Sequence, residues 1–134
     1  MQVQVNFLAV ILATVASYVL ASLWYGFIFA KLWKKLTGIK DMKPSPLNIL
    51  LVLVGSFIMS FVLYHSIAFG NAYLKTGGIS GGMMGGFWDW LGYIVPVTLC
   101  TKLYEKKPWK LWLLDNGFWL IALLAMGGII GGMM

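Results

Sequence analysis

The chain has 134 residues, of which 60% are hydrophobic and only 10% are charged. A soluble domain of this size carries about a quarter charged residues, so the composition argues for a single domain embedded in a membrane. The formal net charge of +6 comes from lysines placed beside apolar segments, which favours anionic lipid headgroups over nucleic acid as the partner. The single cysteine excludes an intrachain disulfide bond.

Two membrane spans are predicted in the first half of the chain. A spanning helix needs about 20 mainly apolar residues, and residues 6–30 contain no charged side chain. This segment is too long for a signal peptide, and no basic residue precedes it. The second span is predicted over residues 47–69, after a Lys-Pro-Ser-Pro sequence. We expect Ser45 to cap that helix and Pro46 to occupy its first turn.

The third span depends on how the sequence GGISGGMMGGFWDW at residues 77–90 folds. If the glycines form a loop, the span begins near Phe87 and Asp89 lies in an aromatic belt at the outer surface. If the helix begins near Gly78, small residues recur every three or four positions along one helix face that also holds Asp89. We favour the helix, over residues 78–101, because a flexible linker has no reason to keep that spacing.

The fourth span is predicted over residues 111–130, where a similar pattern of glycine pairs returns. Small residues at this spacing allow membrane helices to approach closely. The glycines for which we predict helix packing are Gly78, Gly82, Gly85, Gly92, Gly128 and Gly132. The sequence therefore predicts an all-α four-helix bundle, one transmembrane domain over residues 1–134, with packing faces of the glycine-zipper kind.

The lysines predict how the chain is oriented in the membrane. The connection between the first two spans holds Lys31, Lys34, Lys35, Lys40 and Lys43, and the connection between the last two holds Lys102, Lys106, Lys107 and Lys110. The connection between the second and third spans holds only Lys75. By the positive-inside rule, both lysine-rich connections lie in the cytoplasm and both termini lie on the outer side.

The sequence resembles a family of small microbial membrane proteins, domain of unknown function 1761, in two stretches. These are SLWYGFIFAKLWKKLTG at residues 22–38 and TKLYEKKPWKLWLLDNGFWLIALLAMGGIIG at residues 101–131. The matching positions are Trp24, Tyr25, Lys31, Trp33, Leu113, Asp115, Gly117, Phe118 and Trp119. The resemblance implies a four-helix fold in the cytoplasmic membrane of a microbial cell, and it implies no activity.

Four polar residues within the predicted spans are candidates for an ion or proton path: Asp89, Asp115, Asn116 and His65. Asp89 is expected near mid-depth, where an ionisable residue is a functional candidate. Its alternative role is a structural hydrogen bond to Ser, Tyr or His on another helix. Asp115 lies near a helix N-terminus and lysines, which stabilise a carboxylate. Its alternative role is an ion pair or a contact with the Trp-Tyr turn. For His65 the alternative is an interfacial hydrogen bond.

Two classes of function remain open. The sequence contains no nucleophile–base pair, metal-ligand cluster or phosphate-binding loop, so we expect no enzyme activity, no cofactor and no metal. The first class is an oligomeric transporter or channel unit for protons, cations or small solutes. The second is a structural or accessory protein that docks on a partner or on lipid through glycine faces and basic loops. We favour the first slightly, because a mid-depth carboxyl group is costly to keep, and we expect a homo-oligomer.

Overall fold

The computed structural model describes residues 2–41 and 43–134, and its regular elements are all helical, which confirms the predicted all-α class. Two of the elements are short π-helical turns, labelled η1 and η2. In chain order the elements are α1 (Phe7–Leu23), η1 (Trp24–Ile28), α2 (Ala30–Thr37), α3 (Pro46–Leu74), α4 (Gly78–Asp89), η2 (Trp90–Ile94), α5 (Val95–Tyr104) and α6 (Trp109–Met133).

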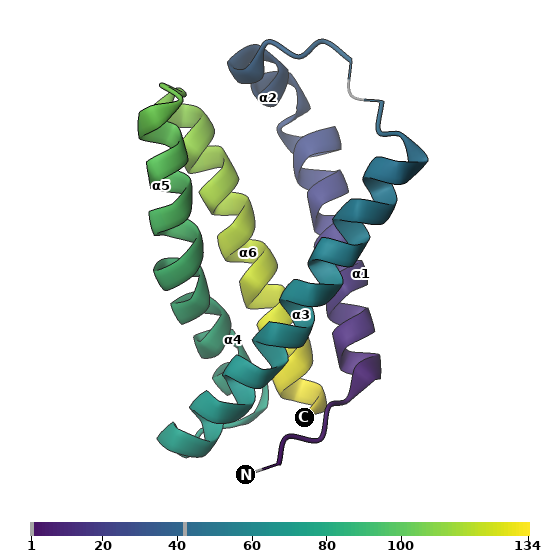
Figure 1. Cartoon of the computed structure of the whole chain (residues 1–134), viewed down its shortest axis with the longest axis vertical. Helices are drawn as coiled ribbons and strands as arrows, with labels where there is room; N and C mark the ends of the chain where they lie inside the picture. The colour runs from purple at the N-terminus through teal and green to yellow at the C-terminus, as the bar shows by residue number, and fades with distance from the viewer. Residues whose placement is uncertain (1, 42) are drawn as a thin grey trace.

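Three helical segments among the described residues are long and apolar enough to cross a membrane. They are Phe7–Ile28, Pro46–Leu74 and Trp109–Met133, which lie over the first, second and fourth predicted spans. The chain is therefore an integral membrane protein. The predicted third span is divided into α4, η2 and α5, which follow one another along α6 (Figure 1).

The glycine-rich stretch is a helix and not a loop. Helix α4 begins at Gly78, whose φ of +69° lies in the left-handed region that favours glycine. The helix continues through the glycine pairs to Asp89. The helical alternative for this stretch is therefore confirmed, and Asp89 lies inside a helical segment.

Pro96 explains why the helix after Asp89 widens into η2. Proline has no backbone N–H, so the Gly92 carbonyl loses the donor that a regular α-helix would supply. The chain compensates with a wider turn, in which the Val95 N–H bonds to the Trp90 carbonyl. The interruption at Pro96 thus produces a π-helical turn, a form in which helices often accommodate a break in their hydrogen-bond ladder.

Helices α4 and α6 touch through their backbones at five glycines. They are Gly78, Gly82 and Gly86 on α4, and Gly127 and Gly131 on α6. A Cβ atom added at Gly82 would overlap the Gly127 carbonyl oxygen, and one at Gly127 would overlap the Gly82 carbonyl oxygen. Only residues without side chains allow this approach.

The other glycines predicted to pack are in different surroundings. Gly85 faces the Ile67 side chain of α3, with 2.8 Å between its would-be Cβ and Ile67 Cγ1. Gly128 and Gly132 face side chains of α4. A Cβ atom at Gly78 would meet nothing within 4 Å, but the Gly78 carbonyl oxygen lies against Gly131 of α6. A Cβ atom at Gly92, which lies in η2, would also meet nothing within 4 Å. The backbone contact with α6 thus runs through Gly78, Gly82 and Gly86, and not through Gly85.

Side-chain caps fix the starts of two long helices. The Ser45 hydroxyl accepts a hydrogen bond from the Asn48 N–H at 3.2 Å, and Pro46 is the first residue of α3, which confirms the predicted cap. Asn6 caps α1 by accepting from the Leu8 N–H at 3.1 Å. Its amide also donates to the Met133 carbonyl at 3.1 Å, so it ties the start of α1 to the end of α6.

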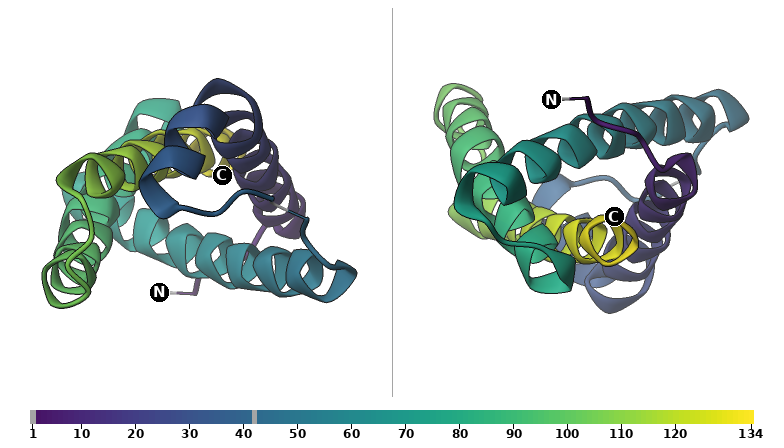
Figure 2. Two further views of the ribbon diagram at one scale, coloured as in Figure 1. Left: turned by 90° about the horizontal axis from the view of Figure 1, so that it is seen from above. Right: turned by 90° about the horizontal axis from the view of Figure 1, so that it is seen from below.

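The two lysine-rich connections lie at one end of the molecule, and both termini lie at the other end (Figure 1). Helix α3 crosses the other helices obliquely, as the views along the long axis show (Figure 2). The predicted topology requires this arrangement of the connections, while the side of the membrane stays a prediction.

Candidate functional site

A carboxyl group and a phenol from distant parts of the chain meet between η1 and α6. The Tyr25 hydroxyl donates a hydrogen bond to Asp115 Oδ1, with 2.6 Å between the oxygens. This length is typical of a hydroxyl bonded to an ionised acceptor. At 1.5 Å per residue, Asp115 lies about 9 Å along α6 from Trp109. Of the two structural contacts predicted for Asp115, the structure contains the one with the Trp-Tyr turn.

The π-helical turn η1 positions Tyr25 for this contact. The turn closes where the Phe29 N–H donates to the Trp24 carbonyl at 2.8 Å. Wide turns of this kind are frequent at functional sites because they redirect neighbouring side chains. Here Trp24 lies over Gly117, while the adjacent Tyr25 reaches Asp115.

The residues that carry the family resemblance gather around this pair. Trp33 of α2 stands edge-on to Tyr25, with 6.3 Å between the ring centroids. Trp119 follows Asp115 by one helical turn and lies on the same side of α6. The motif residues that the fold brings together are Trp24, Tyr25, Trp33, Asp115, Gly117 and Trp119.

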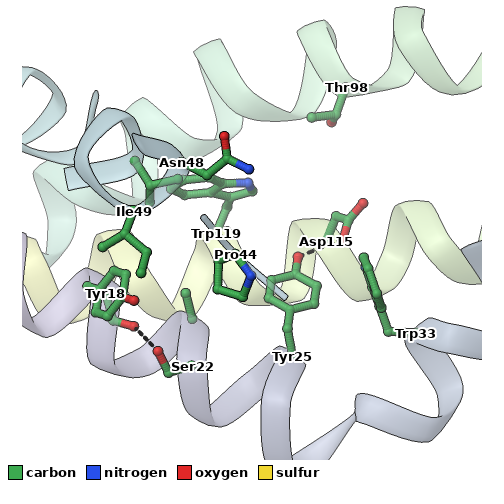
Figure 3. Close-up of a pocket in the computed structure, with 12 residues that line it drawn as sticks. Tyr18, Ser22, Tyr25, Trp33, Pro44, Asn48, Ile49, Thr98, Asp115 and Trp119 are labelled. Carbon is green, nitrogen blue, oxygen red and sulfur yellow. Dashed lines mark hydrogen bonds between the residues drawn. The ribbon is translucent and has the colours of Figure 1, made fainter. Parts of the chain in front are cut away.

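A cleft of about 510 Å³, which we call the Asp115 cleft, opens beside the pair. Its walls come from α1, η1, α2, the start of α3, α5 and α6, and Figure 3 shows the Tyr25 hydroxyl pointing at the Asp115 carboxyl group within it. The lining residues are Tyr18, Ala21, Ser22, Tyr25, Trp33, Pro44, Asn48, Ile49, Val52, Thr98, Asp115 and Trp119. The volume is that of a site for a small organic molecule, about 300–1,000 Å³.

Asp115 also lines a smaller hollow, of about 170 Å³, between α5 and α6. Lys102 and Lys107 line this hollow and not the larger cleft. Lys107 Nζ pairs with a Glu105 oxygen at 2.9 Å, and Lys102 Nζ lies 4.0 Å from the ring centre of Trp109. Both lysines therefore already have partners, and neither forms an ion pair with Asp115 in the part of the chain that the structure describes.

Asn116, the neighbour of Asp115, belongs to a buried polar network that joins α5 and η2 to α6. Its side-chain amide donates to the Thr98 hydroxyl at 3.0 Å and to the Trp112 carbonyl at 2.9 Å. The Trp112 indole N–H donates to the same hydroxyl at 3.2 Å, and the Trp90 indole N–H donates to the Asn116 carbonyl at 3.0 Å. The side chain of Asn116 is thus used in helix packing and does not line the cleft.

Trp24 holds an unpaired donor beside this site. Its indole N–H is buried and makes no hydrogen bond within the described chain, while its ring packs on Phe29 with 4.6 Å between centroids. A buried donor without a partner costs about 1–3 kcal/mol. The turn that carries Tyr25 is therefore less stable than a fully paired turn would be.

Asp89 lies at a separate place, about 16 Å along α4 from Gly78 at 1.5 Å per residue. The Ser66 hydroxyl of α3 donates a hydrogen bond to Asp89 Oδ1 at 3.0 Å. Asp89 lines two hollows, of about 120 and 380 Å³, and neither includes Asp115. The structure thus gives Asp89 a serine partner on another helix, as its structural alternative predicts.

Replacing Asp89 with asparagine is expected to change the unfolding free energy by no more than about 0.5 kcal/mol. An asparagine carbonyl oxygen accepts the Ser66 hydrogen bond as a carboxyl oxygen does. Thermal unfolding in detergent, compared between Asp89→Asn and the parent protein, measures this. A loss above about 2 kcal/mol would show that Asp89 does more than accept this bond.

His65 does not connect the two carboxyl groups. Its Nδ1 lies 2.8 Å from the Phe61 carbonyl oxygen of its own helix, and its ring packs at a tilt against Phe61 with 4.6 Å between centroids. No hydrogen bond joins His65 to Asp89 or to Asp115 among the described residues. The predicted path residues therefore fall into separate places in one chain.

Sequence reasoning missed several residues of the site. Tyr18, Asn48 and Thr98 were not singled out, although each lies in the cleft lining or in the Asn116 network. Thr98 carried a signal, because it is a polar residue within an apolar span and directly follows the break at Pro96. Asn48 carried none, since a polar residue in the first turn of a helix is ordinary.

Comparison with known proteins confirms the family resemblance. The model of a family described as "Protein of unknown function (DUF1761)" matches residues 8–131, which covers α1 from its second residue through most of α6. No curated protein and no solved structure matches the chain.

Proposed function

We propose a function from the site itself, because the chain belongs to the DUF1761 family, whose function is unknown. The protein is a small membrane transport unit in which Asp115 binds a proton or a cation at the head of the Asp115 cleft. One observation carries this proposal: the half-buried Asp115 carboxyl group inside an apolar helix is held at 2.6 Å by Tyr25 and lines a cleft of about 510 Å³.

The choice of a carboxyl group at this place supports a functional role. Within a membrane span an acidic side chain costs about 3 kcal/mol at mid-depth and less near the surface. An asparagine would accept the same Tyr25 hydrogen bond without a charge. Packing of η1 on α6 therefore does not require an acid, whereas binding of a proton or a cation does.

Asp115 also stands between two spaces that a transported ion would use. It lines both the Asp115 cleft and the smaller hollow with Lys102 and Lys107. The hollow lies at the lysine-rich end, which we propose faces the cytoplasm. Asp89 lines different hollows, so we place only Asp115 on the route. The hollows at Asp115 do not continue to those at Asp89 within one chain, and we propose a homo-oligomer whose subunits complete the route.

Membrane flux is the direct test of this function. Purified protein in liposomes is expected to carry protons or monovalent cations, and Asp115→Asn is expected to abolish the flux while it keeps the fold. Tyr25→Phe, which removes the hydroxyl and keeps the ring, is expected to reduce the flux. Fluorescent pH and ion indicators inside the liposomes measure both variants.

Asp89→Asn is the matched control, because it neutralises the other membrane-embedded acid outside the cleft. We expect its flux to equal that of the parent protein. Parent protein without any flux would reject transport and leave the accessory role, in which the lysines and apolar faces dock on lipid or on another protein. Flux that survives in Asp115→Asn would reject Asp115 as the ion-binding residue.

We also propose that α4, η2 and α5 together form the third of four membrane spans, with the lysine-rich end in the cytoplasm of a microbial inner membrane. The exposed Cys100 is first replaced by serine, and single cysteines are then introduced as Lys35→Cys and Lys75→Cys. In intact cells a membrane-impermeant maleimide is expected to label the cysteine at position 75, and to label the one at position 35 only after permeabilisation. The reverse pattern would invert the topology.

A further inference from the structure

We infer that the Asp115 cleft takes a monovalent organic cation that carries aromatic or alkyl groups, such as a quaternary ammonium compound. This inference rests on the proposed transport function and names the substrate class of the same site. It follows from the charge of the lining, from its aromatic rings and from its scarcity of free oxygen ligands.

When Asp115 is ionised, the lining carries a single negative charge. Asp115 is the only aspartate, glutamate, lysine, arginine or histidine among the described lining residues. Asp115 Oδ1 accepts from Tyr25, and Asp115 Oδ2 makes no hydrogen bond within the described chain. One carboxylate oxygen is thus open to a ligand, and the complementary ligand is a cation.

Four aromatic rings from different elements line the same cleft: Tyr18 of α1, Tyr25 of η1, Trp33 of α2 and Trp119 of α6. The face of an aromatic ring attracts a cation, and the attraction is strongest for tryptophan and for desolvated cations. Rings around a carboxylate are the surroundings in which quaternary ammonium groups are recognised.

The lining is poorly suited to a small inorganic cation. Hard cations such as calcium require about six to eight oxygen ligands. The Thr98 hydroxyl is occupied by the Asn116 network, so the Ser22 hydroxyl and the Asn48 amide are among the few oxygen ligands beside Asp115 and the tyrosine hydroxyls. Apart from Asn48, the wall at the start of α3 is apolar, with Ile49 and Val52, and Pro44 lies just before it. An organic cation needs no full oxygen shell and fits a cleft of about 510 Å³.

The lysines near this end do not reverse the argument. Lys102 and Lys107 have their own partners, Trp109 and Glu105, and line the smaller hollow. Repulsion from the exposed lysines of the connections is screened over about 8 Å at physiological ionic strength. Asp115 acts on a bound cation at contact distance, so its attraction decides the sign of the charge that binds.

Direct binding tests this inference. The full-length protein in phosphatidylcholine nanodiscs is dialysed against radiolabelled benzyltrimethylammonium, and binding to empty nanodiscs is subtracted. We expect saturable binding to the parent protein, and a loss of affinity of at least about tenfold for Asp115→Asn. Phenylacetate, an anion of similar size, is expected not to bind.

A tryptophan pair keeps the test decisive if Asp115→Asn fails to fold. Trp119→Leu removes a ring from the cleft and is expected to weaken binding, whereas Trp88→Leu removes an exposed ring outside the cleft and is expected to leave it unchanged. Equal binding of phenylacetate, or equal affinity in both tryptophan variants, would overturn the inference.

Flux and binding together separate the two proposals. Proton flux that depends on Asp115 without benzyltrimethylammonium binding would reject the organic cation and keep the transport function. Binding that depends on Asp115 in a protein without flux would keep the cation site and reject transport.

Discussion

Replacing Gly82 with alanine is expected to destabilise the protein by about 3 kcal/mol or to prevent its folding. The added methyl group would overlap the Gly127 carbonyl oxygen and would also lie 2.9 Å from the Gly131 Cα atom. Both neighbours are backbone atoms, so a rotamer change cannot relieve the overlap. Helices α4 and α6 would have to separate, and the contact that allows their close approach would be lost.

Gly55→Ala is the matched control for this change. Gly55 lies within α3, and a Cβ atom there would meet nothing within 4 Å. The same methyl group is added to a helix in both variants, so the difference between them isolates the contact with α6. Thermal unfolding of the two variants in one detergent gives that difference. Equal melting temperatures would show that α4 and α6 do not approach at Gly82.

The apolar segments and their boundaries could be predicted from local chemistry. Long uncharged runs indicate α1, α3 and α6, and Ser45 followed by Pro46 marks the start of α3 because these residues satisfy and fit a first helical turn. The spacing of small residues predicted that the glycine-rich stretch begins a helix at Gly78. Each of these inferences depends only on residues close to one another in the sequence.

The register of the glycine contact could not be predicted in the same way. Gly85 and Gly86 are both glycines, so spacing along α4 does not tell which one faces α6. The crossing geometry of the two helices decides it, and Gly86 faces the Leu123 carbonyl while Gly85 faces Ile67. A pair of adjacent glycines leaves two faces available, and only the partner helix selects one.

The candidate site was predicted in part. The Trp-Tyr pair and Asp115 carry the family resemblance, and a contact between Asp115 and the Trp-Tyr turn was one of its predicted roles. The cleft beside them was not predicted, because it depends on the oblique course of α3 and on η1, whose sequence contains no proline. Nothing local in Trp24–Ile28 indicates a π-helical turn.

The two π-helical turns converge on one short part of α6. η1 places Trp24 over Gly117 and Tyr25 on Asp115, and η2 places Trp90 on the Asn116 carbonyl. In a regular helix each side chain is rotated from the previous one by a fixed angle, and a π-helical turn changes that angle. The two wide turns thereby direct three aromatic residues onto consecutive positions of α6. Tyr25 thereby orients the Asp115 side chain, while Trp90 bonds to the backbone of the next residue, and such positioning is the preorganisation that a binding residue needs.

Replacing Thr98 with valine is expected to lower the unfolding free energy by about 2 kcal/mol. The side chains have nearly the same shape, but valine cannot accept the hydrogen bonds from Trp112 and Asn116, which lie at 3.2 and 3.0 Å from the Thr98 hydroxyl. The Trp112 indole N–H would be left without its partner, and an unmade buried bond costs more than a made bond contributes.

Thr101→Val is the control on the same helix, because the Thr101 hydroxyl bonds only to the Val97 carbonyl of its own helix at 3.3 Å. We expect that variant to stay within about 0.5 kcal/mol of the parent protein. Thermal unfolding in detergent, with tryptophan fluorescence as the probe, compares the two. Equal stability of both valine variants would show that the Asn116 network does not hold α5 on α6.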